Sequence, residues 1–149
     1  MSDSYADLTF AATYFEGRYP SDAWDNVANE VRTKVLIHGT RLIDQLNFAG
    51  DKYDEDQENE FPRGDNPDVP DAIKKANCEL AYALLEGLDP ELESESAFQT
   101  ASVFDVIRIN RQQSLIPTRI LHGIISQAAW NYLRPYLRDP SSITLSRSS

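Results

Sequence analysis

The sequence predicts a mainly α-helical fold, a small bundle of about four helices in one domain. Apolar residues recur three and four positions apart in several segments, and helix-capping and helix-ending residues bracket those segments. A length of 149 residues with 41% hydrophobic and 26% charged residues suits one globular domain. We expect a helical domain over residues 1–139 and an extended C-terminal arm over residues 140–149.

The N-terminal third predicts two helices with a turn between them. Asp7 or Thr9 can cap a short helix within residues 8–18, and Tyr19-Pro20 ends it. A capped turn at residues 21–24 then brings Trp24 to the core. A second helix is expected from about residue 28 to 46, with apolar residues at helical spacing. Its predicted packing stripe is Val31, Val35, His38, Leu42 and Leu46, widened by Leu36 and Ile43.

A third helix is predicted between Pro70 and Gly87, because proline fits the first helical turn and glycine the position just past the end. Its predicted inner face is Ile73, Ala76 or Asn77, Leu80, Ala83 and Leu84.

The C-terminal part predicts a change of structure and then a last helix. Residues 97–110 alternate well enough for a short β-strand or hairpin, although a helix is the competing interpretation. The last helix is expected over residues 117–137, and Asp139-Pro140 stops it. Its predicted packing residues are Ile120, Leu121, Ile124, Ile125, Ala128, Tyr132 and Leu133.

Charge is distributed unevenly along the chain, which has a net charge of -10. Residues 1–105 hold 23 carboxylates and 8 cations, whereas residues 106–149 hold 6 arginines and 1 carboxylate. Nucleic-acid binding depends on cations that displace counterions from phosphates, so the acidic body repels DNA. Only the C-terminal third has the positive charge to bind a polyanion.

The most acidic segment is a predicted loop at residues 50–71, with nine carboxylates and two cations. A solvated or disordered loop is the simplest interpretation of such a run. In its middle, however, Phe61 is expected to anchor the loop on the helices and Pro62 to fix its direction. Arg63 is expected to pair with a carboxylate such as Asp44 or Glu79.

Catalytic signatures are missing from the sequence, so we expect no enzyme. His38, His122 and Cys78 each fall among apolar residues at helical spacing, which favours packing over catalysis or metal binding. Phosphate-binding, nucleophile-elbow and zinc motifs do not occur, and we expect no cofactor. The chain has no apolar run long enough for a membrane and no signal-peptide pattern, so we expect a cytosol-like compartment.

One resemblance rests on the order of motifs across residues 5–90. GTRLIDQL, Phe48-x-Gly50-x-Lys52, Gln57-x-x-x-FPRG and VPDAIKKANCELAYALLEG follow one another here. This order resembles a family of tailed-bacteriophage proteins catalogued as DnaT-like single-stranded DNA-binding proteins. Its members are similar in size and helix order to head-completion or head-to-tail adaptor proteins. The matching loop motif implies a structural anchor made by Gly50, Gln57, Phe61, Pro62 and Arg63.

The adaptor resemblance implies a virion protein at the head-tail junction, assembled in the host cytoplasm. Its expected partners are the portal, tail or nozzle proteins, further copies in a ring, by analogy a dodecamer, and packaged double-stranded DNA passing without sequence-specific binding. The candidate channel-facing or inter-subunit carboxylates are Asp51, Asp54, Glu55, Asp56, Glu58 and Glu60. The candidate portal-binding arm comprises Arg134, Arg138, Ile143, Thr144, Leu145 and Arg147.

The alternative is a replication accessory protein that binds single-stranded DNA. Such a protein uses a basic groove and exposed aromatic platforms on which bases stack. The N-terminal aromatic residues lie instead in an acidic part of the chain. They are Tyr5, Phe10, Tyr14, Phe15, Tyr19 and Trp24.

Overall fold

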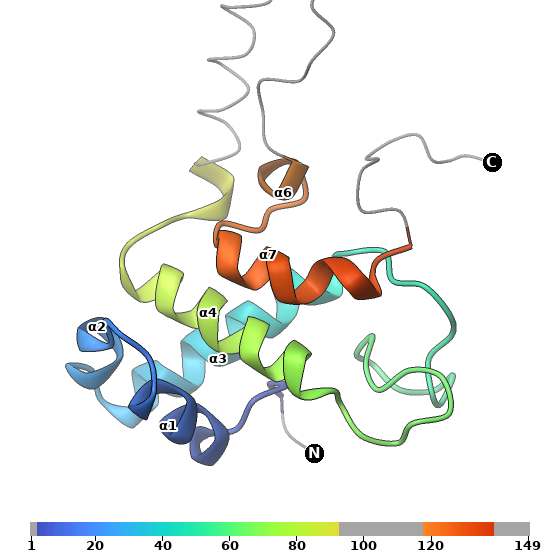
Figure 1. The fold of residues 1–149 in the computed structure, drawn as a ribbon, viewed down its shortest axis with the longest axis horizontal. Coiled ribbons are helices and arrows are strands. Elements are labelled where there is room, and N and C mark those ends of the chain that lie inside the picture. Colours follow the sequence, from blue (N-terminus) through green and yellow to red (C-terminus); the bar gives the residue numbers. More distant parts are fainter. Residues whose placement is uncertain (1–2, 93–117, 139–149) are drawn as a thin grey trace, which may run out of the picture.

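The structure, a computed structural model, describes residues 3–92 and 118–138 as a helical bundle (Figure 1). Its elements are α1 (Leu8–Glu16), α2 (Asp22–Asp25), α3 (Asn29–Asp44), α4 (Asp71–Leu85), α6 (Thr118–Leu121), α7 (Gln127–Leu133) and the 3-10 helix η1 (Arg134–Tyr136). The predicted mainly α fold is confirmed, and no strand occurs in these two ranges. The predicted strand at 97–110 and the arm at 140–149 lie outside the described residues.

Helix α4 is the centre of the bundle and contacts α1, α2, α3 and α7. Side chains on nearly all sides of it are buried, which is typical of a helix surrounded by others. These are Ile73, Ala76, Asn77, Cys78, Glu79, Leu80, Ala81, Tyr82 and Ala83. Among the described residues, no helix is long and apolar enough to cross a membrane.

Two apolar clusters make the core. One joins the end of α3 to α4 and α7 through Ile43, Leu80 and Leu133. The other joins the N-terminal helices to α4, and there the rings of Phe15 and Trp24 stack with centroids 4.5 Å apart. Trp24 is buried, as the capped turn predicts.

Local capping signals placed most helix ends correctly. The Asp7 carboxylate accepts a hydrogen bond from the Phe10 N–H at 2.8 Å and caps α1. Pro70 directly precedes α4, and Gly87 follows it with φ of 93°, a conformation that favours glycine.

The predicted face of α3 is partly wrong. Val31 and His38 are exposed, whereas Gly39 and Thr40, which lie outside the predicted stripe, are buried together with the predicted Leu36. The apolar spacing alone does not reveal that α3 meets α4 through a small residue. The close contact at Gly39 centres the buried face of α3 on Leu36, Gly39 and Ile43, away from Val31 and His38.

The predicted last helix is wrong as one continuous element, because it breaks between α6 and α7. Gly123 adopts φ of 83°, and the Ile124 N–H donates to the Arg119 carbonyl at 2.8 Å, which ends α6 in a tight turn. The Ser126 hydroxyl then accepts from the Ala129 N–H at 3.1 Å and starts α7. Of the predicted packing residues, Ala128 is exposed, and Ala129 with Trp130 takes the buried position.

Asn77 connects three segments at the point where α3 and α4 are closest. Its amide oxygen accepts from the Ala6 N–H at 2.9 Å, and its amide nitrogen donates to the Leu36 carbonyl at 2.9 Å. A Cβ atom added to Gly39 would lie 2.8 Å from Nδ2 of Asn77 and 3.3 Å from Cβ of Leu80. Gly39 is therefore required for close packing rather than for its backbone conformation.

Replacing Gly39 with alanine is expected to lower the free energy of unfolding by about 1–3 kcal/mol, because overpacking outweighs the gain in helix propensity. The Asn77 side chain cannot move away without breaking its two hydrogen bonds. Gly17→Ala is the matched control, since a Cβ atom added there would lie 3.9 Å from the Tyr14 carbonyl oxygen, an ordinary contact distance. Urea unfolding of both variants checks this, and equal stabilities would contradict the packing argument.

An ion pair joins the end of α1 to α4. The Arg18 guanidinium donates to both carboxylate oxygens of Glu79, at 2.8 and 3.0 Å, and lies 4.0 Å from the centroid of the Tyr82 ring. The Tyr14 hydroxyl donates to the same carboxylate. Burial raises the pKa of Tyr14, and the hydrogen bond to Glu79 raises the pKa of Arg18. Glu79 is 6% exposed, and these hydrogen bonds satisfy its buried carboxylate.

Candidate functional site

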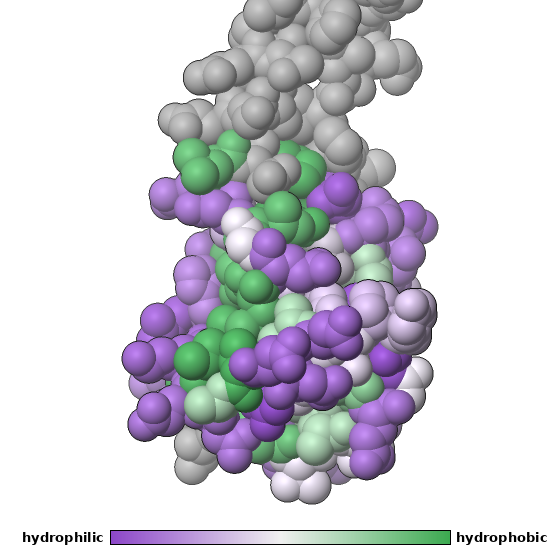
Figure 2. Space-filling view, turned by 90° about the vertical axis from the view of Figure 1, so that its left-hand side faces the viewer, coloured by the Kyte–Doolittle hydropathy of each residue, from purple (hydrophilic) through white to green (hydrophobic). Residues whose placement is uncertain are grey.

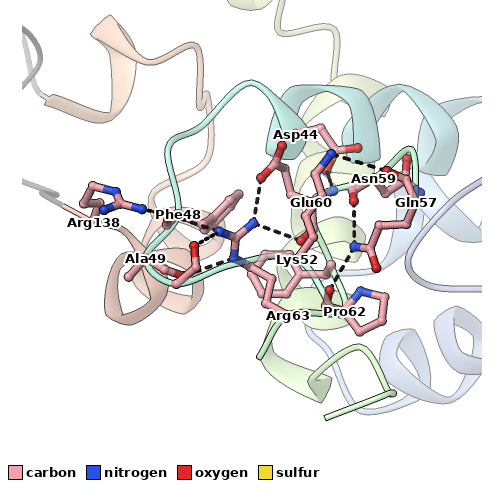
Figure 3. A network of polar contacts seen from close by, with 12 residues as sticks. Asp44, Phe48, Ala49, Lys52, Gln57, Asn59, Glu60, Pro62, Arg63 and Arg138 are labelled. Atoms are coloured by element: carbon pink, nitrogen blue, oxygen red, sulfur yellow. Dashed lines mark hydrogen bonds and ion pairs between the residues drawn. The ribbon is translucent and has the colours of Figure 1, made fainter. Parts of the chain in front are cut away.

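The acidic loop connects α3 to α4 and is held by a network of side-chain contacts (Figure 3). Arg63 is its centre. The guanidinium donates to the carbonyl oxygens of Phe48, Ala49 and Gly50 at the start of the loop, and to the carbonyl and carboxylate oxygens of Glu60. One side chain thus ties the first part of the loop to its middle.

The expected partner of Arg63 is wrong. Its ion pair is with Glu60, at 2.7 Å, and not with Asp44 or Glu79. Glu79 is occupied by Arg18, and Asp44 accepts from Tyr5. The carboxylate that pairs with Arg63 therefore belongs to the loop itself.

Phe61 fixes the loop to the core. Its side chain is 4% exposed, and its ring makes edge-to-face contacts with Tyr5, Phe48 and Tyr136, at centroid distances of 6.0, 4.7 and 5.8 Å. These three rings come from the N-terminal segment, the start of the loop and η1. Edge-to-face pairs add stabilisation beyond the burial of area, so Phe61 joins three segments of the chain.

Gln57 and the backbone close the loop on itself. The Gln57 amide donates to the carbonyls of Asn59 and Pro62 at 2.8 and 2.9 Å, and its oxygen accepts from the Asp54 N–H at 3.1 Å. The backbone pairs in an antiparallel bridge between Lys52 and Arg63. Glycines with positive φ, Gly50 and Gly64, lie beside this bridge.

Tyr5 and Asp44 hold the loop from the helical side; the sequence predicts that Asp44 contacts the loop through Arg63, and it does not predict the role of Tyr5. The Tyr5 hydroxyl donates to Asp44 and accepts from the Phe61 N–H at 3.1 Å. Asp44 also accepts from the Glu60 N–H at 3.2 Å. Burial raises the pKa of both Tyr5 and Asp44. Tyr5 and Phe61 are 56 residues apart in the chain, so no local pattern indicates their contact.

The six candidate carboxylates of the loop do not share one environment. Glu60 is partly buried against Arg63. The other five are exposed, and they are Asp51, Asp54, Glu55, Asp56 and Glu58. The loop therefore has a fixed backbone and an acidic outer surface.

A cleft of about 500 Å³ opens between α3 and the loop. The residues that line it are Asp3, Ile37, Thr40, Arg41, Asp44, Asp56, Gln57, Glu58 and Asn59. In the described ranges, no three or more His, Cys, Asp or Glu side chains are grouped to hold a metal ion.

The two described residues of the candidate arm lie at its base. Arg134 and Arg138 are exposed, and the Arg138 N–H donates to the Asn47 carbonyl at 3.0 Å. The chain thus leaves the described region beside the start of the acidic loop. Ile143, Thr144, Leu145 and Arg147 lie outside the described residues.

The N-terminal aromatic residues mostly serve the core. Tyr5, Phe15 and Trp24 are buried. Phe10 and Tyr14 are partly buried, and only Tyr19 of this group is exposed, at 96%. They do not form the row of exposed rings that stacked bases would need.

The two histidines and the cysteine lie on different elements. His38 is exposed on α3, and the His122 ring stacks on Trp130 with centroids 5.7 Å apart. Cys78 is buried in α4, and burial raises the pKa of its thiol to about 12.

The Cys78 thiol is expected to react with an aromatic disulfide reagent at pH 8 about a thousandfold more slowly in the folded chain than in urea. The thiolate is the reactive form, and its fraction falls about tenfold for each unit by which the pKa rises. Absorbance of the released thiolate measures both rates. Comparable rates would mean that Cys78 is accessible in the folded chain.

Comparison with known families gives one match. A family model described as "Putative DnaT-like ssDNA binding protein" matches residues 1–145. Searches of curated proteins and of solved structures found no match. Since the matched range includes the bundle and the acidic loop, this chain belongs to the DnaT-like family.

Proposed function

We propose that this chain is a head-to-tail adaptor of a tailed bacteriophage. Copies of it form a ring beneath the portal, extend the DNA channel and provide a docking surface for tail proteins. The observation that carries the proposal is the acidic loop, whose five exposed carboxylates stand on a backbone fixed by Arg63 and Phe61.

A fixed acidic surface suits a channel through which duplex DNA slides. Like charges repel over a Debye length of about 10 Å at 0.1 M salt, so the wall keeps the phosphates at a distance. A disordered loop would spread the same charge over many positions. The contacts of Arg63, Gln57 and Asp44 instead hold the backbone that carries the carboxylates in one arrangement.

A ring also needs surface for protein contacts. The face of the molecule in Figure 2 carries a strip of hydrophobic residues between hydrophilic ones. Just beyond α4, Leu88 and Leu92 are 37% and 60% exposed. Exposed apolar surface of this kind supports association with another protein.

Single-stranded DNA binding is the second candidate, and the description of the family favours it. The distribution of charge and aromatic residues favours the adaptor. Tyr19 and Tyr53 are the exposed aromatic residues of the described ranges, and Tyr53 stands on the acidic loop. Stacking without neighbouring cations gives weak binding, because the phosphate contacts supply most of the non-specific affinity.

Titration of a labelled single-stranded oligonucleotide, followed by fluorescence anisotropy, separates the two candidates. The adaptor proposal expects no saturable binding at physiological salt. Tight binding there, with an affinity that falls steeply as salt rises, would overturn it and establish the second candidate.

Mixing the chain with portal rings and imaging the complex tests the adaptor directly. The expected result is one additional layer of density beneath the portal, and its loss when residues 140–149 are deleted. An intact layer in the deletion variant would remove the arm from the proposal. No layer with the full chain would contradict the adaptor itself.

A further inference from the structure

The cleft between α3 and the acidic loop has the shape and charge to hold a basic side chain. Asp3, Asp56 and Glu58 stand at its exposed edge, and their carboxylates bond to no other group of the described ranges. The fourth carboxylate, Asp44, is engaged with Tyr5. Arg41 is the one cation of the lining, so the cleft remains strongly negative.

Two residues of α3 contribute less exposed surface to the cleft. Ile37 is partly buried there, and Thr40 is 1% exposed with its hydroxyl accepting from the Tyr5 N–H at 2.9 Å. Arginine and lysine place their alkyl stems on apolar surface and their charged ends among polar groups. The volume of about 500 Å³ lies within the range of ligand-sized clefts.

A complementary cation lies on another element of the same chain. Arg134, at the start of η1, is exposed and makes no ion pair within the described ranges. It belongs to the C-terminal part of the sequence, where arginines exceed carboxylates by five. The cleft is on α3, which passes behind α4 and α7 in Figure 1, whereas η1 continues from α7.

We propose that the cleft receives the Arg134 guanidinium of a second copy of this chain. The contact joins two different surfaces of the subunit, so it is head-to-tail and can repeat around a closed ring. A guanidinium between two or more carboxylates is also a directional contact, which fixes the angle between neighbours. This inference rests on the proposed ring and names the contact that would build it: Asp56 and Glu58 belong to the contact, and Asp51, Asp54 and Glu55 are left to the channel wall.

Charge exchange between the two surfaces tests the contact. One variant carries Asp56→Arg and Glu58→Arg, a second carries Arg134→Glu, and a third combines all three changes. Each of the first two is expected to raise the concentration for half-maximal assembly about tenfold or more. The combined variant is expected to recover most of the loss, because the same contact forms with its charges reversed.

Sedimentation velocity of the chain alone and copy number on portal rings are the two measurements. Asp51→Arg with Glu55→Arg is the matched control, since it makes the same charge change at two exposed carboxylates of the same loop outside the cleft. Circular dichroism confirms that every variant is folded. Assembly that is unchanged by the cleft variant, or equally impaired in the control, would overturn the inference.

The two measurements also separate this inference from the proposed function. Self-association that follows the charge exchange, without any binding to portal, would retain the contact and contradict the adaptor. Assembly on portal with no response to the exchange would retain the adaptor and contradict the contact. A wild-type chain that neither self-associates nor assembles on portal would contradict both.

Discussion

Glu79→Ala is expected to lower the free energy of unfolding by about 3 kcal/mol, which is the lower end of the range for breaking a buried ion pair. The lower end applies because Arg18 is 22% exposed and keeps part of its hydration. The loss has two parts. The guanidinium loses two charge-assisted hydrogen bonds while its stem stays packed on Tyr82, and the Tyr14 hydroxyl loses its acceptor.

The size of the effect should depend on the charge that is left behind. Glu79→Met alone leaves Arg18 without its partner, whereas Arg18→Met with Glu79→Met removes both charges and retains apolar volume. The double variant should therefore lose less stability than Glu79→Met. Glu86→Ala is the control, because that residue is exposed at the end of the same helix. Urea unfolding gives the four free energies, and a loss below about 1 kcal/mol for Glu79→Ala would place the pair among surface ion pairs.

The sequence predicted the elements whose signals are local. The Asp7 cap, Pro70 before α4 and Gly87 after it each act within a few residues, so the corresponding helix ends could be placed. The break at Gly123 is a local signal too, but the apolar spacing of residues 120–133 fits a continuous helix and outweighed it. In the structure α6 ends before Gly123, and α7 begins after the Ser126 cap.

The contacts that hold the loop could be predicted only in part. An apolar residue inside an acidic run indicates an anchor, and Phe61 is buried. The partners of that anchor come from residues far away in the sequence, since Tyr5 and Tyr136 lie more than fifty residues from it on either side. Asp44 as an acceptor of Tyr5 likewise depends on how the N-terminal segment crosses α3. Contacts of this kind follow from tertiary packing. The apolar spacing along a single sequence indicates which residues are buried but not which distant residues they contact.

Phe61→Ala is expected to cost about 3–5 kcal/mol in the free energy of unfolding, the range for truncating a buried aromatic side chain. The Phe61 ring contacts aromatic residues of three segments, so its loss leaves a cavity that no single segment can fill by moving. Phe61→Leu should lose less, because it retains part of the volume. Tyr53→Ala is the control on the same loop, since that side chain is 50% exposed and should change stability by about 0.5 kcal/mol or less.

Amide hydrogen exchange of Phe61→Ala, compared along the chain, distinguishes a loop anchor from an ordinary core residue. If Phe61 holds the loop, Phe61→Ala should increase amide hydrogen exchange at residues 52–64 more than in the middle of α4. The hydrogen bonds of Arg63 and Gln57 remain possible in the variant, but without the ring the loop loses its attachment to Tyr5 and Tyr136. Exchange that rises equally in the loop and in α4 would mean that the substitution weakens the whole bundle. The carboxylates would then not depend on Phe61 for their fixed positions.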